Sequence, residues 1–345
     1  MSKRNHSIDI FRYICSIMVV AIHTHPFEDI DERLSYVFTY ILPRVAVPFF
    51  FIVAGYFYIN NLEKQNAFKL YIKRIVKIYA LWSLPYFAID YIQWGHQTFK
   101  GFIAHIVYSF LITGSHYHFW YFPALIFSVC ITTIIYKINL NKILIPVSIL
   151  LYCIGCLGCS YHSLGMRTPI LCTLYSSQHF TLIRRVLLMA FPFFSAGLLV
   201  KKIENYINNK GISKTALFIC LLITALCWLV EIILVISFHL HDNIIITFGL
   251  FIFTVAIMVL LLQYPMPNMY FASQKAHILA DFTYYVHPLI IGGLTAFTTV
   301  VCNIIIPQTV LFILVIAITW VGGTMIMYYK KYSTRRMNTS ENIDK

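Results

Sequence analysis

The sequence predicts an all-α, polytopic integral membrane bundle, and three observations lead to that fold class. Of the 345 residues, 59% are hydrophobic and only 11% are Asp, Glu, Lys or Arg, well below the roughly 25% of a soluble domain. The hydrophobic runs are long and nearly continuous, as in 217–230 and 244–262. A membrane β-barrel would show short alternating segments instead, so the runs favour helices, whose backbone groups bond internally. The third observation is the placement of the basic residues.

The hydrophobic runs predict about ten membrane spans, because each is close to the roughly 20 residues that cross the hydrocarbon. The shorter run 101–113 is expected to form an interfacial or re-entrant helix. Arg184 and Arg185 open the sixth span, which is therefore the weakest. The expected spans are 8–25, 36–60, 70–93, 118–137, 143–160, 184–200, 214–238, 244–263, 278–301 and 306–329.

The basic residues predict that both termini are cytoplasmic. With that orientation, 19 of the 26 Lys and Arg residues fall in inner segments and six in outer segments, and Arg12 lies within the first span. Cytoplasmic loops of membrane proteins are enriched in Lys and Arg. The same rule explains the net charge of +13 without a nucleic-acid partner. We therefore expect a multi-pass protein of the cell (plasma) membrane, surrounded by the lipid bilayer.

The chain is expected to form one transmembrane domain over residues 1–332, followed by a polar cytoplasmic tail over 333–345. The composition of the tail favours disorder. It equally fits a linker cut before a further cytoplasmic domain. The first segment does not resemble a cleaved signal peptide, because Asp9 and Arg12 interrupt its hydrophobic run.

Arg12 and His23 are the most informative polar residues, since ionisable groups inside spans are costly and mark functional sites. They are eleven residues apart, about three helical turns, and so lie on one face roughly 16 Å apart along the axis. That places a cation near the inner leaflet and an imidazole near the outer leaflet. Such a helix suits a bundle that binds an anionic ligand inside and transfers protons further out. The alternative, a snorkelling Arg12 and an interfacial His23, stays equally open.

Asp281 and His287 lie in the ninth expected span and, six residues apart, do not share a helix face. His287 precedes Pro288, which frees a backbone carbonyl and favours a kink.

The expected outer side is rich in histidine and also carries Arg44, Arg184 and Arg185. Neutral imidazole suits general-base catalysis, and arginine suits phosphate or carboxylate binding. At least half of the histidines are expected to be solvated loop residues. The outer histidines are His23, His25, His96, His105, His116, His118, His162, His179, His239 and His241.

No metal site is predicted, because the pairs His116/His118 and His239/His241 lack a clear set of further ligands. Most of the nine cysteines are expected to be small hydrophobic residues inside spans. A disulfide and, with less support, a metal site stay open for one group, Cys153, Cys156, Cys159 and Cys172.

Five segments resemble motifs of the acyltransferase 3 family of membrane O-acyltransferases. In the second of them Ala54 stands where serine is more usual. The segments are Ile8-Asp-Ile-Phe-Arg12 with His23, Arg44-Val-Ala-Val-Pro-Phe-Phe-Phe-Ile-Val-Ala-Gly-Tyr56, His118-Phe-Trp-Tyr-Phe-Pro-Ala-Leu125, Phe191-Pro-Phe-Phe-Ser-Ala-Gly197 and Tyr284-Tyr-Val-His-Pro288.

The resemblance implies an enzyme that takes an acyl group, acetyl above all, from a cytoplasmic acyl-CoA co-substrate. The acceptor implied is an extracytoplasmic hydroxyl, mainly of cell-envelope carbohydrate, and no permanently bound cofactor is implied. It implies catalytic roles for His23 and Arg12. Donor binding is expected from Arg12, Lys73, Arg74 and Lys77, and acceptor binding from Arg44, His118, Trp120, Arg184, Arg185, Asp281 and His287.

Two further functions stay open. The runs 21–26 and 114–120 are similar to the membrane half of VanT-type serine racemases of vancomycin resistance. That likeness implies an L-serine transporter, with Arg12, Asp281 and His287 as its site and a cytoplasmic racemase domain or partner. A pair of Gly/Pro-broken spans in matching halves, common in such carriers, is missing. The third function, a membrane anchor for another enzyme, ranks last because ten spans exceed what anchoring needs.

Overall fold

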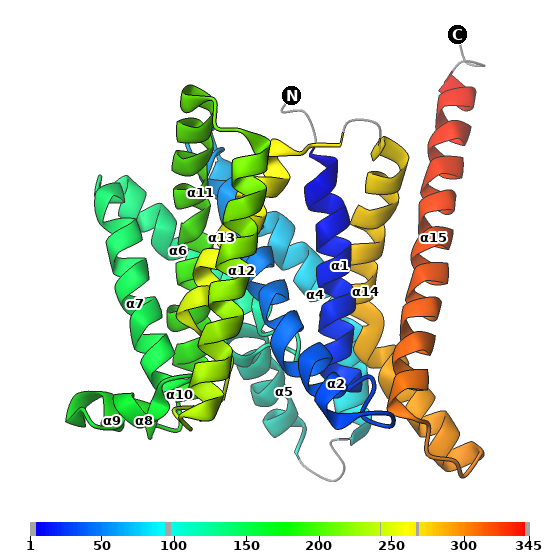
Figure 1. Cartoon of the computed structure of the whole chain (residues 1–345). Helices are drawn as coiled ribbons and strands as arrows, with labels where there is room; N and C mark the ends of the chain where they lie inside the picture. The colour runs from blue at the N-terminus through cyan, green and yellow to red at the C-terminus, as the bar shows by residue number, and fades with distance from the viewer. Residues whose placement is uncertain (1–4, 94–97, 242, 267–268, 342–345) are drawn as a thin grey trace. The chain divides into compact units, whose positions relative to one another are not determined.

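The computed structural model describes residues 5–93, 98–241, 243–266 and 269–341, and no residue in these ranges forms a β-strand. The all-α prediction is therefore confirmed for the described chain (Figure 1). The chain divides into two compact units. The terminal unit comprises Met1–Val47 and Leu261–Lys345, and the central unit comprises Pro48–Leu260.

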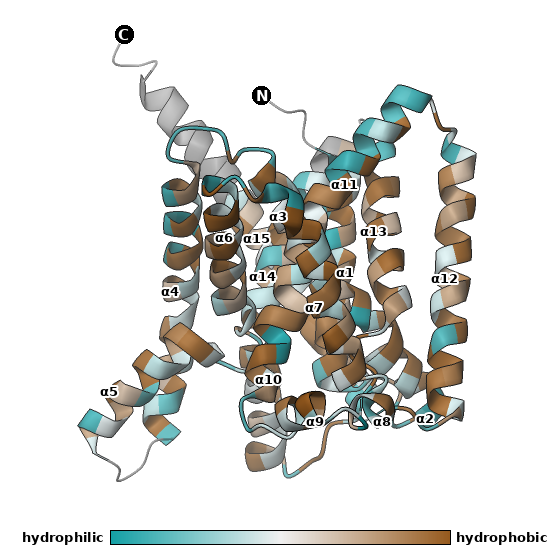
Figure 2. Cartoon of the chain, turned by 90° about the vertical axis from the view of Figure 1, so that its left-hand side faces the viewer, coloured by the Kyte–Doolittle hydropathy of each residue, from teal (hydrophilic) through white to brown (hydrophobic). Residues whose placement is uncertain are grey.

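The helices identify a multi-pass membrane protein. Hydrophobic residues cover most of the helical surface, and hydrophilic residues gather near helix ends and in loops (Figure 2). Eight helical segments of the described chain are long and apolar enough to cross a membrane. They are His6–Thr24, Glu32–Ile59, Ala67–Gln93, Asn141–Gly158, Phe180–Lys210, Lys214–Ser237, Ala272–Val301 and Gln308–Tyr329.

The expected fourth and eighth spans are also helical but shorter than expected. They are α6 (Tyr121–Lys137) and α13 (Phe248–Gln263), of 17 and 16 residues. Their starts were predicted too early, because turns and irregular backbone occupy residues 118–120 and 244–247. The expected interfacial run is the helical segment Phe99–Thr113, also below spanning length.

The terminal unit is built on α1 (His6–Thr24), α14 (Tyr270–Ala296) and α15 (Gln308–Glu341). The side chain of Asn5 caps α1 by accepting hydrogen bonds from the backbone N–H groups of Ser7 and Ile8, and it donates to the carbonyl of Leu261 at 3.0 Å. The cap satisfies amides that a helix start leaves without partners. The remaining described elements of this unit, apart from parts of α3 and α13, are α2 (Glu32–Tyr36), η1 (Val37–Ile41), η2 (Leu42–Val45) and η7 (Phe297–Val301).

Helices α1 and α14 run in the same direction. Arg12, early in α1, bonds Asp281, and His23, late in α1, stacks on His287 further along α14. Two parallel spans need an odd number of crossings between them. Five long candidate spans lie between, so none or two of the three shorter hydrophobic helices cross. Ten spans satisfy this condition if α6 and α13 are the two.

Helix α15 packs antiparallel to α14, with Val20, Leu311 and Val315 forming a buried core between the helices of this unit. The start of α1 and the end of α15 lie at the same end of the terminal unit (Figure 1). The helix continues to Glu341, and residues 342–345 lie outside the described residues. Disorder of the tail stays a prediction.

The central unit contains two glycines from the motif segments at a close helix crossing. A Cβ built on Gly55 of α3 (Ala46–Ile59) would lie 1.9 Å from the carbonyl oxygen of Phe194 in α11 (Phe191–Lys210). A Cβ on Gly197 would lie 2.2 Å from the backbone nitrogen of Tyr56. Small residues permit such close approach of membrane helices, so this crossing explains both glycines.

The other described elements of the central unit follow in chain order. They are α4 (Ala67–Gln93), α5 (Phe99–Tyr108), η3 (Ser109–Thr113), α6, η4 (Asn141–Ile143), α7 (Leu144–Gly158), α8 (His162–Gly165), α9 (Pro169–Tyr175), α10 (Phe180–Ile183), η5 (Arg184–Ala190), α11, α12 (Lys214–Ser237) and α13.

Candidate functional site

Polar side chains of the terminal unit converge on Arg12. The guanidinium Nη2 of Arg12 donates to Oδ1 of Asp281 at 2.8 Å, and Nη1 lies 2.7 Å from Nδ1 of His277. Oδ1 of Asp9 is 3.9 Å from Arg12, and Ser273 donates to Oδ2 of Asp9 at 2.8 Å. We call these five residues the Arg12 cluster. It joins α1 to α14 through charge-assisted hydrogen bonds.

The bond from Arg12 determines the protonation of His277. A guanidinium only donates, so Nδ1 of His277 must accept and the neutral ring carries its proton on Nε2. That nitrogen lies 3.9 Å from Oδ2 of Asp281. The Arg12 cluster then holds one guanidinium and two carboxylates, so Arg12 is not an isolated cation.

His277, Asp9 and Ser273 were missing from the residues that the sequence singled out. The available signal was the i, i+4 spacing of His277 and Asp281, which places two polar side chains on one helix face. His277 lies one residue before the expected ninth span, whereas α14 begins at Tyr270. The early helix start brings His277 and Ser273 onto the same element as Asp281.

His23 meets a second histidine of α14. Its ring stacks on that of His287, with centroids 5.4 Å apart and planes inclined by 20°. His287 is fully buried. Arg12 and His23 therefore both face α14 and share one face of α1.

Pro288 fixes the tautomer of His287. Proline has no N–H to donate to the carbonyl four residues earlier, which is that of Tyr284. Nδ1 of His287 lies 3.0 Å from this carbonyl oxygen and 3.0 Å from that of Thr283. Carbonyl oxygens only accept, so Nδ1 carries the proton, and Nε2 is the basic nitrogen of the neutral ring. The carbonyl that the sequence predicted to be freed is thus bonded by the neighbouring histidine.

The central unit carries a second polar cluster, in the turn that precedes α6. Nδ1 atoms of His116 and His118 are 3.3 Å apart, and the buried ring of Tyr86 lies 4.5 and 5.2 Å from the two imidazoles. His118 is only 4% exposed. Burial lowers the pKa of His116 to about 4, so this imidazole is neutral at physiological pH.

Trp120 and Arg185 form a cation–π contact beside this turn. The guanidinium carbon of Arg185 lies 5.4 Å from the centroid of the Trp120 ring. Arg184 precedes it at the start of η5, and both arginines are half-buried. The third arginine predicted to bind the acceptor, Arg44, lies in η2 of the terminal unit, where its Nε donates to the carbonyl of Tyr40 at 3.0 Å.

The basic residues predicted to bind the donor lie along α4. Lys73, Arg74 and Lys77 are all exposed. Within the described part of the chain, none of the three makes an ion pair or side-chain hydrogen bond. Lys73 and Lys77, four residues apart, present like charges on one helix face, an arrangement that a bound polyanion would stabilise.

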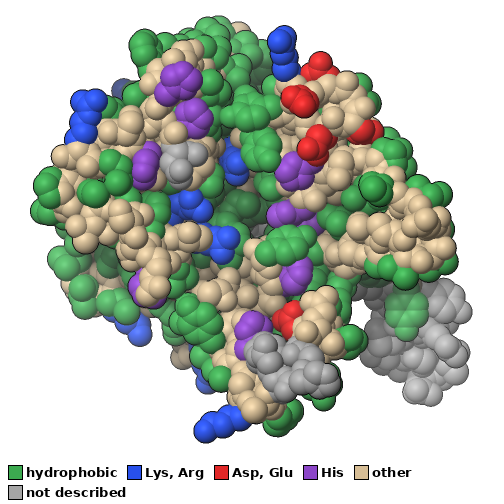
Figure 3. Space-filling model, turned by 90° about the horizontal axis from the view of Figure 1, so that it is seen from below, with side chains coloured by type: hydrophobic (Ala, Val, Ile, Leu, Met, Phe, Trp, Pro, Cys, Tyr) green, Lys and Arg blue, Asp and Glu red, His purple; other side chains and the backbone are tan. Residues whose placement is uncertain are grey.

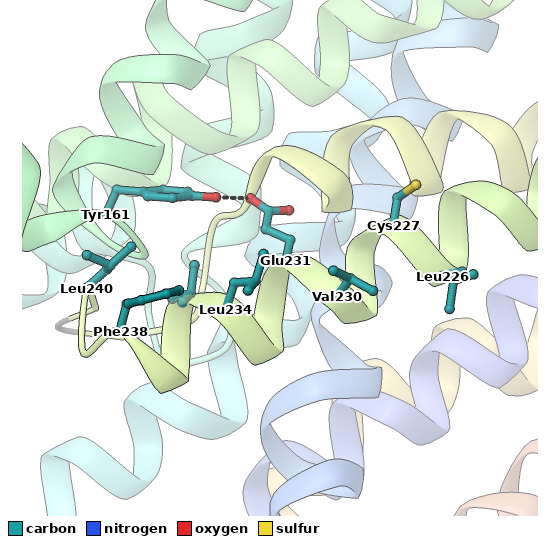
Figure 4. Close-up of a pocket in the computed structure, with 9 residues that line it drawn as sticks. Tyr161, Leu226, Cys227, Val230, Glu231, Leu234, Phe238 and Leu240 are labelled. Carbon is teal, nitrogen blue, oxygen red and sulfur yellow. Dashed lines mark hydrogen bonds between the residues drawn. The ribbon is translucent and has the colours of Figure 1, made fainter.

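An apolar pocket of about 560 Å³ lies along α12. Its polar end is occupied by Glu231, which accepts a hydrogen bond from the hydroxyl of Tyr161 at 2.7 Å (Figure 4). Glu231 also accepts from the backbone N–H groups of Phe248 and Gly249, the first residues of α13. The carboxylate therefore stabilises a helix start inside the protein.

Histidine and acidic side chains are visible on the face drawn in Figure 3. Acidic Asp90 lies 3.9 Å from His105, while His96 lies outside the described residues. In the part of the chain that the structure describes, no group of three or more His, Cys, Asp or Glu side chains could hold a metal ion. The nine cysteines are all present as free thiols.

Comparisons with known proteins give the family. The chain is similar to an amino-acid racemase of Enterococcus faecalis, 35% identical over 182 residues, which cover 51% of this chain and 26% of the relative. It is 33% identical over 228 residues to a serine/alanine racemase of Enterococcus gallinarum, covering 62% of this chain and 31% of the relative. The chain thus matches less than a third of the length of these relatives.

No solved structure matches the chain. The family model described as an acyltransferase domain matches residues 5–329, nearly the whole chain. The protein is therefore a membrane protein that belongs to the acyltransferase 3 family.

Proposed function

We propose that the chain is a membrane-embedded acyltransferase that moves an acyl group from a cytoplasmic acyl-CoA to an extracytoplasmic hydroxyl, with both termini in the cytoplasm. The observation that carries the proposal is the arrangement on α1. Arg12 and His23 face one partner helix, and His23 stacks on a histidine whose tautomer is fixed. Membership of the acyltransferase 3 family supports transferase chemistry.

In the proposed reaction, the His23 and His287 pair supplies the base. A neutral imidazole removes the proton from the acceptor hydroxyl, whose oxygen attacks the thioester carbonyl. The carbon–sulfur bond breaks, an ester forms, and the thiolate of CoA leaves and takes up the proton. General-base catalysis by a positioned imidazole accelerates such steps by roughly 10²–10⁴-fold.

The donor phosphates are assigned to the exposed face of α4. Lys73, Arg74 and Lys77 supply three cations that the described chain leaves without acidic partners. Arg12 is already paired with Asp281. We therefore assign Arg12 a positioning role, in which its charge holds His277 and Asp281 against α1, in addition to the donor contact expected from the resemblance.

The test measures acyl transfer in inside-out membrane vesicles that contain the full chain. Radiolabelled acetyl-CoA is added, and label is followed into the envelope carbohydrate fraction while free CoA thiol is titrated. We expect His23→Ala to abolish both signals, with His179→Ala, an exposed histidine, as the matched control. Thermal unfolding of each purified variant checks folding. Transfer by His23→Ala at the rate of the control would remove His23 from the mechanism.

A second candidate function is an L-serine carrier. Arg12 and Asp281 form an ion pair within the helices of one unit, and such a pair complements the carboxylate and ammonium groups of an amino acid. Similarity to a serine/alanine racemase supports this candidate. Uptake of radiolabelled L-serine into proteoliposomes without acyl-CoA, lost in Asp281→Asn, would favour the carrier. Acetyl transfer without uptake would exclude it.

A further inference from the structure

Arg184 and Arg185 carry positive charge that the described residues of the central unit do not neutralise. They are consecutive, both are half-buried, and neither makes an ion pair or side-chain hydrogen bond with a described residue. Adjacent like charges repel, and partial burial removes the water that would screen them. Buried cations are normally paired, so this pair indicates a place for an anion.

Three of the four described acidic residues of the same unit have other partners, and the fourth is exposed. Glu204 accepts from Lys201 at 3.0 Å and from the Tyr56 hydroxyl at 2.8 Å, and Glu231 caps α13. Asp90 faces His105, and Glu63 is exposed in the loop that precedes α4. Asp242 lies outside the described residues. The four described acids therefore leave the two arginines to an external anion.

Trp120 adds a flat surface to this positive site. The indole lies 5.4 Å from the Arg185 guanidinium and is half-buried, whereas the two preceding residues, His118 and Phe119, are buried. The centroid of the buried Phe51 ring lies 6.1 Å from that of the indole. Indole rings pack against the C–H face of sugar rings, and stacked arginines keep their N–H groups available for carboxylates and phosphates.

The local backbone explains why these groups meet. Pro192 cannot donate a hydrogen bond to the carbonyl of Leu188, and the wide π-helical turns of η5, Arg184–Ala190, precede it. Such turns are frequent at functional sites. On the other side, a Cβ at Gly114, whose φ is +96°, would lie 2.3 Å from the nitrogen of Trp120. Only glycine lets this loop pack against the start of α6.

We propose that Arg184, Arg185 and Trp120 bind the acceptor, and that the acceptor is a saccharide bearing an anionic group, a carboxylate or a phosphate. The inference rests on the proposed acyltransferase function and names the chemical class of its acceptor. The arginines bind the anionic group bidentately and the indole stacks on the sugar ring.

Binding of matched probes tests the site. The full chain, purified in neutral detergent, is titrated calorimetrically with a glucuronate-containing hyaluronan hexasaccharide and with the neutral chitin hexasaccharide. We expect the anionic probe to bind about 10- to 100-fold more tightly. The double variant Arg184→Gln/Arg185→Gln should lose this difference, while Arg167→Gln, an exposed arginine, should retain it. Trp120→Leu should weaken binding of both probes.

A charge-conserving variant separates binding from folding. Arg184→Lys/Arg185→Lys keeps the two positive charges but loses the planar guanidinium groups. We expect its affinity for the anionic hexasaccharide to lie between those of the parent and the glutamine variant. Equal affinity of the parent protein for the two hexasaccharides would overturn the proposal. An unchanged preference for the anionic hexasaccharide in the glutamine variant would overturn it as well. Tighter binding of short-chain phosphatidylglycerol that depends on the same arginines would also overturn the proposal, because it would assign the site to a lipid headgroup.

The two proposals fail separately. Selective binding of the anionic probe without any acetyl transfer would support the anion site and contradict the proposed acyltransferase function. Acetyl transfer to neutral and anionic acceptors at equal rates, with no effect of Arg184→Gln/Arg185→Gln, would support the acyltransferase function. The same result would contradict the anion site.

Discussion

The crossing of α3 and α11 makes a sharp prediction about stability. Alanine at Gly197 would place its Cβ 2.2 Å from the backbone nitrogen of Tyr56, and alanine at Gly55 would place it 1.9 Å from the carbonyl oxygen of Phe194. Ordinary contact begins at 3.4 Å, so the helices must separate by more than about 1 Å. The neighbouring atoms belong to the backbone and cannot rotate away.

Overpacking of this kind costs about 1–3 kcal/mol, and backbone neighbours favour the upper end of that range. Replacing a helical glycine by alanine returns about 0.5–1 kcal/mol. We therefore expect a net loss of about 2 kcal/mol for either variant. That corresponds to a decrease in Tm of roughly 4–8 °C, using the scaling for large domains.

Two glycines of α14 provide the matched control. A Cβ at Gly292 or Gly293 would meet nothing within 4 Å, so alanine there should leave Tm unchanged or raise it slightly. The assay is thermal unfolding of the purified protein in detergent, followed by size-exclusion chromatography. If Gly197→Ala melted within 1 °C of Gly292→Ala, the close crossing would not exist as described.

Three further predictions follow. The pKa of His116 is lowered by burial to about 4, so between about pH 6.5 and 4 the unfolded chain binds a proton that the folded one does not. Stability then falls with decreasing pH, and His116→Gln should weaken this dependence when Tm is measured from pH 7 to 4. Glu231→Gln should cost about 2–3 kcal/mol of unfolding free energy, because an amide satisfies the α13 amides less well than a carboxylate. Pro288→Ala restores an N–H that competes with His287 for the Tyr284 carbonyl, and acetyl transfer should slow by about 2- to 10-fold without loss of folding.

Each of these predictions can fail in a distinct way. A His116→Gln variant with the parental pH dependence would assign the acid sensitivity to another group. A Glu231→Gln variant as stable as the parent would mean that the helix start finds other partners. Unchanged transfer by Pro288→Ala would show that the tautomer of His287 does not affect catalysis.

Much of the site could be anticipated from helical periodicity. Arg12 and His23 were placed on one face of the first span by their eleven-residue separation, and the structure brings both against α14. Pro288 was predicted to free a carbonyl, since its missing N–H is a local property. His277 was missed because its partner lies on a helix more than 260 residues away in sequence.

The sequence by itself determined that this protein is a multi-pass helical membrane protein of the acyltransferase 3 family. Hydrophobicity, helical period and motif residues are carried by each segment separately, so they can be read without knowing its neighbours. Only the tertiary structure decided that Asp281 neutralises Arg12, that Gly55 and Gly197 permit a close helix crossing, and that Arg184 and Arg185 stand beside Trp120 without a described acid partner. Burial and charge compensation depend on which helices meet, and that choice depends on the packing of whole helices.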